Sequence, residues 1–197
     1  MTSTSPTTRP GRPRSEQTHR AILEATQEVL RERGYGGLSL DEIARRAKVG
    51  KRTIYRWWSS KGALVAEAFR EDATHRHPTV DTGTVRGDLL SYLSTLFAEV
   101  GNPGKKAALS SMMAEAQTGG DFAADFARFI DDRRALVRHL LERGVQRGEL
   151  ALDTDLDLAV DVLFGLFWYR VLTGDRPLDP TVAQTLVDGL LHATRPT

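Results

Sequence analysis

The sequence predicts an all-α protein with about nine helices, because three observations agree. Apolar residues recur every three or four positions, the spacing that places them on one face of a helix. No segment alternates apolar and polar residues over the length of a strand. Glycine and proline cluster at breaks where helices should end, such as Gly101-Asn102-Pro103-Gly104 and Gly119-Gly120.

The N-terminal segment, residues 1–14, is expected to be a disordered basic arm. It consists mainly of Ser, Thr, Pro and Arg and has almost nothing apolar to bury. A helix should begin near Ser15 and end at Gly34, because glycine tolerates the left-handed C-cap. One face of this helix carries Ile22, Leu23, Thr26, Val29 and Leu30.

A helix-turn-helix is predicted over about residues 39–58. Ser39 opens the first helix and Glu42 follows three residues later, which is the spacing of a capping box. The turn is Lys48-Val49-Gly50, and a second helix should run to about Trp58. The residues expected to hold the two helices together are Ile43, Ala44, Ala47, Val49, Ile54 and Trp58.

The opposite face of the second helix is basic and suited to DNA. Lysine and arginine can donate to guanine O6 and N7 in a major groove, and Thr53 and Tyr55 suit phosphate oxygens or a thymine methyl. Lys61, at the start of the next helix, should contact a phosphate. Arg12 and Arg14 suit a narrow minor groove, with a solubilising tail as the alternative. The basic residues of this face are Lys51, Arg52 and Arg56.

The charge distribution points the same way. Residues 1–62 contain 13 Lys and Arg against 6 Asp and Glu, whereas the remainder contains 14 against 20. Such a division is typical of a nucleic-acid-binding end joined to an end that avoids DNA.

The remaining helices follow from spacing and caps. Ser59 and Ser60 can cap a helix that stops before Pro78, and Asp179 with Pro180 is an N-cap followed by proline at the first helical position. Asp121 is expected to cap a long helix that closes near Gly148. Apolar residues at helical spacing between positions 89 and 100 and between 109 and 116 indicate two further helices, and the last two are expected over residues 155–173 and 180–194.

Several function classes are disfavoured. The chain has no cysteine, which excludes disulfides and thiolate chemistry. His75 and His77 have no carboxylates at ligand spacing, so no metal is expected. The sequence contains neither a glycine-rich phosphate loop nor a nucleophile elbow, the motifs that would suggest an enzyme or a cofactor. Without a membrane span or signal peptide, a cytoplasmic protein is the default expectation.

Residues 16–76 resemble the DNA-binding domain of the TetR family of bacterial transcriptional regulators. The most specific matches are Gly34-Tyr35, the helix start at Ser39–Ile43, Thr53-Ile54-Tyr55 and Lys61. The resemblance implies a homodimer, a third helix in the major groove and a small-molecule effector that loosens DNA binding. It places DNA contacts at Ser39, Lys51, Arg52, Thr53, Tyr55, Arg56 and Lys61.

Two positions depart from the family pattern. The family usually has glycine where this chain has Lys48, and Ser or Thr where it has Gly50. A left-handed turn at Lys48 would cost roughly 1 kcal/mol relative to glycine. On this resemblance, residues 15–76 form the DNA-binding domain and residues 77–197 the ligand-binding and dimerisation domain.

The helix over residues 155–173 is apolar on two sides, so one side should face its own bundle and the other a partner. With the helix over residues 180–194 it could form a four-helix interface, and a monomer that buries both sides is the alternative. The residues expected at this interface are Leu163, Phe167, Val171, Val182, Leu186 and Leu190.

An effector pocket is expected among aromatic and methionine side chains, which make adaptable apolar walls, although each of them is more often plain core. Arg133, Arg134 and His139 could orient a polar group. The candidate lining residues are Phe97, Met112, Met113, Phe122, Phe126, Phe129, Trp168 and Tyr169.

The sequence therefore predicts a sequence-specific DNA-binding regulator. The favoured form is a repressor that a small apolar or amphipathic effector releases from a palindromic double-stranded operator. An activator or an effector-independent regulator is the alternative within this class. A DNA-architectural protein without sequence preference is the alternative of another class, and an enzyme with an added DNA-binding domain is the least favoured reading.

Overall fold

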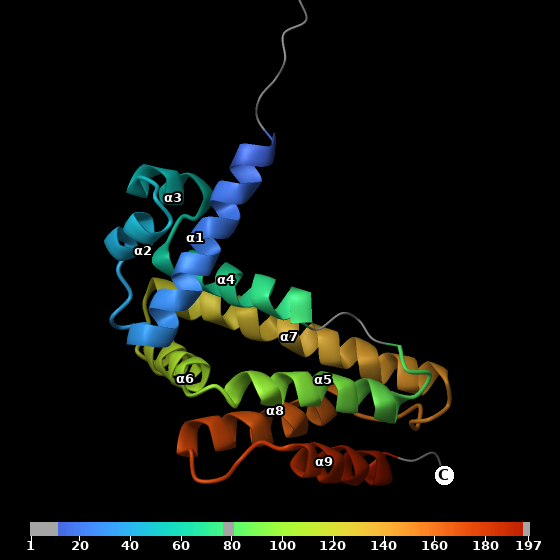
Figure 1. The fold of residues 1–197 in the computed structure, drawn as a ribbon. Coiled ribbons are helices and arrows are strands. Elements are labelled where there is room, and N and C mark those ends of the chain that lie inside the picture. Colours follow the sequence, from blue (N-terminus) through green and yellow to red (C-terminus); the bar gives the residue numbers. More distant parts are fainter. Residues whose placement is uncertain (1–11, 77–80, 195–197) are drawn as a thin grey trace, which may run out of the picture.

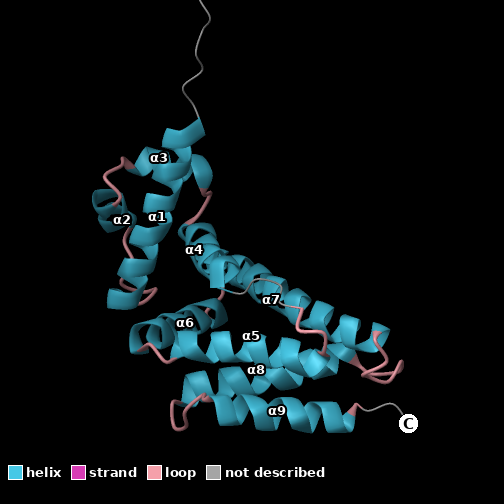
Figure 2. Cartoon of the chain, turned by 45° about the vertical axis from the view of Figure 1, so that its right-hand side comes forward, coloured by secondary structure: helices cyan, strands magenta, loops and turns pink. Residues whose placement is uncertain are grey.

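The computed structural model describes residues 12–76 and 81–194, and these form nine α-helices and no strand (Figures 1 and 2). The prediction of an all-α fold is confirmed. A small N-terminal unit contains four helices: α1 (Arg12–Arg33), α2 (Leu40–Arg46), α3 (Lys51–Trp57) and α4 (Lys61–Arg76). A larger bundle contains the other five: α5 (Val85–Val100), α6 (Pro103–Gln117), α7 (Asp121–Gln146), α8 (Leu156–Thr173) and α9 (Pro180–Ala193).

Most helix ends follow the signals in the sequence. The Asp155 carboxylate caps α8 by accepting from the Leu158 amide, and the Asp179 carboxylate caps α9 in the same way. Two ends differ from expectation. Helix α1 begins at Arg12 rather than near Ser15, and Gly120, not Asp121, is the N-cap residue of α7.

The turn between α2 and α3 contains a left-handed lysine. Lys48 has φ of 54° and is the one described residue other than glycine with a positive φ. Gly50 is the extended N-cap residue of α3, as predicted. The strained conformation expected at Lys48 is therefore present, and the surrounding helices maintain it.

Helix α4 joins the two parts of the molecule, because it packs on α1 and also lies along α7 (Figure 1). A Cβ atom at Gly62 would lie 2.7 Å from both Phe122 Cδ2 and Asp125 Oδ2. The Ser60 hydroxyl donates to Asp125 at 2.7 Å, and the Tyr35 ring stacks on Phe122 with 4.2 Å between centroids. The start of α4 is thus fixed against the start of α7.

The other end of the bundle is held by a buried carboxylate. Asp88, on α5, is only 1% exposed and accepts from the Arg143 and Arg147 guanidinium groups at 2.7 and 3.1 Å. The amide and hydroxyl of Thr82 donate to the same carboxylate. Burial raises the pKa of Asp88, but these hydrogen bonds and the arginine charges outweigh it and hold the pKa below its usual value.

The placement of α8 corrects part of the predicted dimer interface. Leu163, Phe167 and Val171 lie at most 2% exposed in the chain's own core, so they cannot meet a partner. Both sides of α8 are apolar, and spacing alone did not show which of them faces inward. The side that stays exposed carries Leu158 (59%), Val162 (43%), Tyr169 (60%) and Leu172 (51%).

Helix α9 packs against α5. Of the three α9 residues predicted at the interface, Leu190 is buried within the chain, whereas Val182 and Leu186 are half-buried. The surface available on α9 is therefore smaller than expected.

Replacing Lys48 by glycine should raise the free energy of unfolding by about 1 kcal/mol, because glycine adopts a positive φ without steric cost. Urea unfolding at a fixed protein concentration measures the change. Ala47→Gly is the matched control, since Ala47 has φ of −72° and glycine there should destabilise. A loss of stability in Lys48→Gly would contradict the explanation.

Replacing Asp88 by alanine should lower the free energy of unfolding by about 3 kcal/mol, because Thr82, Arg143 and Arg147 all lose their buried acceptor. Asp188→Ala, which breaks the exposed pair with Arg86, should cost less than about 1 kcal/mol. Since the folded-state pKa of Asp88 is lowered, its contribution is present above about pH 4 and disappears as the pH falls further. Equal losses in the two variants would contradict this account.

Candidate DNA-binding surface and apolar cavity

Helix α3 has one buried side and one exposed side. Ile54 and Trp58 are 1% and 3% exposed, which confirms that they anchor the helix. The Trp58 indole donates to Glu67 of α4 at 2.7 Å, and the His19 ring of α1 stacks on Trp58. His19 Nε2 lies 3.1 Å from the Glu67 carboxylate. The end of α3 is therefore tied to both α1 and α4, a link that helical spacing did not predict.

The predicted capping box at the start of α2 does not form. The Ser39 side chain makes no capping hydrogen bond. The Glu42 carboxylate instead accepts from Arg45 at 2.7 and 2.9 Å and from Arg46 at 2.8 Å. These hydrogen bonds lower the pKa of Glu42 to about 2. Two guanidinium groups offer this carboxylate three charge-assisted hydrogen bonds, whereas the capping box offers one amide, so Glu42 faces the arginines.

Four of the predicted DNA contacts lie together on the exposed side of α3: Lys51, Arg52, Tyr55 and Arg56. Tyr55 is 57% exposed, far more than a tyrosine that serves the core. Thr53 is half-buried beside them. Lys51 pairs with Asp41 at 2.9 Å, and the Arg56 guanidinium lies 5.1 Å from the centre of the Trp57 ring. The surface is thus cationic and supported from behind by aromatic side chains.

The other predicted DNA contacts are placed differently. Lys61 is half-buried, with Nζ 4.1 Å from the centre of the Tyr35 ring and 3.4 Å from the Tyr35 carbonyl oxygen. Ser39 is exposed at the start of α2. The side chains of Arg12 and Arg14 lie outside the described residues. The contacts of these four residues with DNA stay predictions.

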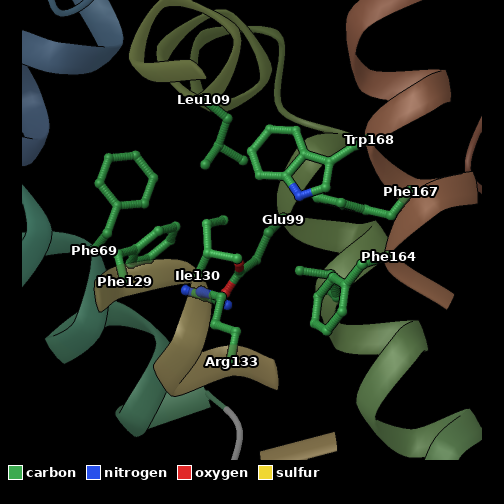
Figure 3. A pocket seen from close by; sticks show the side chains of 10 residues that line it. Phe69, Glu99, Leu109, Phe129, Ile130, Arg133, Phe164, Phe167 and Trp168 are labelled. Carbon is green, nitrogen blue, oxygen red and sulfur yellow. The ribbon is translucent and has the colours of Figure 1, made fainter. Parts of the chain in front are cut away.

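An apolar cavity lies where α4 meets the helices of the bundle (Figure 3). About 390 Å³ of space between the lining side chains is not filled by atoms, but part of it is open to solvent and very little of it is wide enough for a water-sized sphere. A ligand therefore has to move side chains apart to enter. The lining residues are Phe69 of α4, Leu96 and Glu99 of α5, Leu109 of α6, Phe129, Ile130 and Arg133 of α7, and Phe164, Phe167 and Trp168 of α8.

Of the predicted pocket residues, Phe129 and Trp168 line this cavity. Tyr169 points to solvent, and Met113 is half-buried outside the lining. The others are buried in the core and are not part of the lining: Phe97, Met112, Phe122 and Phe126.

The lining also contains residues that the sequence reasoning missed. Phe69 lies on a helix assigned to the DNA-binding domain, and Phe167 was assigned to the dimer interface. The run Phe164, Phe167 and Trp168 has the spacing of one helical face and could have indicated a shared aromatic wall. Of the three residues that could orient a polar group, Arg133 lines the cavity, whereas Arg134 pairs with Asp161 and His139 is exposed.

Comparison with known proteins identifies the family. Residues 22–68 match the family described as "Bacterial regulatory proteins, tetR family", and residues 79–190 match "Tetracyclin repressor-like, C-terminal domain". The chain is 37% identical over 180 residues to the uncharacterised HTH-type transcriptional regulator YdeS of Bacillus subtilis, covering 90% of each chain. It is 32% identical over 192 residues to the DNA-binding transcriptional repressor TetR of Mycobacteroides abscessus, covering 90% of this chain and 94% of the relative.

Solved structures show the same fold. The TetR family transcription regulator SCO0332 superposes with a TM-score of 0.77 at 32% identity, covering 91% of this chain and all of that one. FadR from Bacillus subtilis, in complex with stearoyl-CoA, superposes with a TM-score of 0.70 over 88% of this chain and 97% of that one, and at 20% identity this similarity concerns the fold alone. No helix among the described residues is long and apolar enough to cross a membrane. By its two matching domains, its relatives and its helix-turn-helix, the chain belongs to the TetR family of bacterial transcriptional regulators.

Proposed function

We propose that the protein represses transcription by binding a palindromic operator as a homodimer, and that a small molecule in the α4–α8 cavity releases it. The proposal that the protein binds an operator rests on helix α3, which has one buried side and one exposed basic side. Its buried anchors fix its orientation, and its cationic surface faces away from the protein. Family membership supports DNA-binding regulation and dimerisation.

In this proposal Lys51, Arg52 and Arg56 enter the major groove. Arginine recognises guanine through paired donors, and Tyr55 and Thr53 add hydrogen bonds to phosphates. Lys61 can reach a phosphate only if it leaves the Tyr35 ring, so its contact would form on binding.

The exposed apolar side of α8 is proposed to form the dimer contact. Large side chains at Leu158, Val162, Tyr169 and Leu172 share this side. Half-buried Val182 and Leu186 of α9 would extend it. A two-fold symmetric pair could then place the two recognition helices about 34–36 Å apart, one turn of duplex.

Effector release is supported by the position of Phe69. This residue lines the cavity from α4, the helix that also holds Trp58 through Glu67. A ligand that separates Phe69 from Phe129 would move α4 and, with it, α3. Such a ligand shifts the equilibrium only if it binds the two states unequally. FadR, a neighbour in fold, has been solved with stearoyl-CoA, an amphipathic molecule, which supports a ligand with a large apolar part in this architecture.

Arg52→Ala should weaken binding to a duplex selected from a random-sequence pool by about 1–3 kcal/mol, because a base contact is lost. Fluorescence anisotropy at two salt concentrations measures this change. The matched control is Arg86→Ala, which removes the same charge at the start of α5, remote from α3, and should leave affinity unchanged. Similar affinity in both variants would rule out a direct Arg52 contact.

Leu172→Glu should convert the dimer to a monomer, because a carboxylate in an apolar contact loses its hydration without a partner. Light scattering after size-exclusion chromatography distinguishes one 21.8 kDa chain from two. Leu152→Glu is the control, since Leu152 is 90% exposed and lies outside α8. A Leu172→Glu protein that stays dimeric would place the contact elsewhere.

Ile130→Phe should fill part of the cavity and make the repressor unresponsive while leaving operator binding intact. A ligand found by thermal shift stabilises the wild type by about 2.7 kcal/mol at 100 times its Kd. That stabilisation should fall in Ile130→Phe in parallel with effector-induced release. Full response in this variant would exclude the cavity as the effector site.

A further inference from the structure

The effector cavity has only two charged residues in its lining. Glu99 projects from α5 and Arg133 from α7, and all the other lining residues are apolar. Figure 3 shows the carboxylate and the guanidinium lying beside each other near the middle of the cavity. The polar part of the site is therefore one compact region in an otherwise apolar space.

Arg133 is held in place and offers a donor. Its guanidinium carbon lies 4.6 Å from the centre of the Phe129 ring, a cation–π contact. Its Nε is buried and has no hydrogen-bond partner among the described residues. A buried donor without an acceptor is unfavourable, so a ligand oxygen that reaches it would gain strongly.

Glu99 limits what that oxygen can belong to. A ligand carboxylate would be attracted by Arg133 but repelled by Glu99 in the same cavity. A ligand ammonium would be attracted by Glu99 but repelled by Arg133. Either charge would also have to give up its hydration on entering apolar surroundings. A neutral group loses less hydration and can use both residues at once.

We propose that the effector is a neutral, mainly apolar molecule with a carbonyl-type acceptor and an adjacent hydrogen-bond donor at one end. The acceptor oxygen binds the Arg133 guanidinium, and the donor faces the Glu99 carboxylate. This inference rests on the proposed effector role of the cavity. The gaps between the lining side chains are narrow, which suits a compact, flat ring system.

Three probes with the same ring test the polar selectivity: 2-naphthamide, 2-naphthoate and 2-(aminomethyl)naphthalene. Their affinities for the full-length protein are measured by calorimetry at pH 7.5, where the second is an anion and the third a cation. The neutral amide should bind at least about tenfold more tightly than either charged probe, a difference of about 1.4 kcal/mol.

Two substitutions should change the relative affinities of the probes, one in favour of the anion and the other in favour of the cation. Glu99→Gln removes the repulsion of the anion and should improve naphthoate binding at least about tenfold relative to the amide. Arg133→Met keeps an unbranched apolar side chain but loses the charge and the donor, and it should improve binding of the ammonium probe relative to the amide. Arg134→Met is the control, because Arg134 pairs with Asp161 outside the cavity and should leave the order unchanged.

The outcomes separate the inference from the function on which it rests. A charged probe that binds the wild type as tightly as the amide, with binding abolished by Ile130→Phe, overturns the ligand class but keeps the cavity as a binding site. Failure of all three probes to bind overturns the cavity as well. Each comparison is made between probes on one variant. Partial unfolding would weaken the binding of all three probes and could not change their order of affinity. If Arg133→Met does not fold, the Glu99→Gln comparison decides.

Discussion

The close contact of α4 with α7 at Gly62 fixes the geometry of the whole molecule. The atoms of Phe122 and Asp125 leave no room for a Cβ there, so α4 can approach α7 only with glycine at this position. From this contact α4 continues toward its C-terminus through Glu67 and Phe69. Glu67 secures the recognition helix through Trp58, while Phe69 reaches the cavity. A displacement of α4 would therefore reach both the recognition helix and the apolar cavity.

The charges of the DNA-binding unit divide into two groups. Acidic residues of α1 and α2 neutralise inward-facing arginines, as in the contacts of Arg46 with Glu32 and Glu42. The outward-facing Arg52 has no such partner among its described contacts, and Lys51 pairs only with an exposed aspartate, which phosphates can displace at little cost. Internal pairing thus stiffens the unit without reducing the positive potential that DNA meets.

Local chemistry made much of the fold predictable. Asp179-Pro180 favours the start of a helix, and Gly34 favours the end of one, through their own conformational preferences. The exposed basic side of α3 followed from helical spacing in the same way. The partner of Glu42 did not, because it depends on competition between a backbone amide and two guanidinium groups. Spacing also left open which side of α8 faces inward and which aromatic residues border a gap, because both depend on the helices that pack against it.

In the proposed mechanism, the narrowness of the cavity determines the effector concentration needed for a response. An effector there must first separate packed rings, so its observed affinity is its affinity for the open form reduced by the population of that form. Each 1.4 kcal/mol needed for opening raises the half-maximal effector concentration about tenfold. Changes in the packing of rings such as Phe164 could therefore adjust the concentration at which the regulator responds, without altering a polar contact to the ligand.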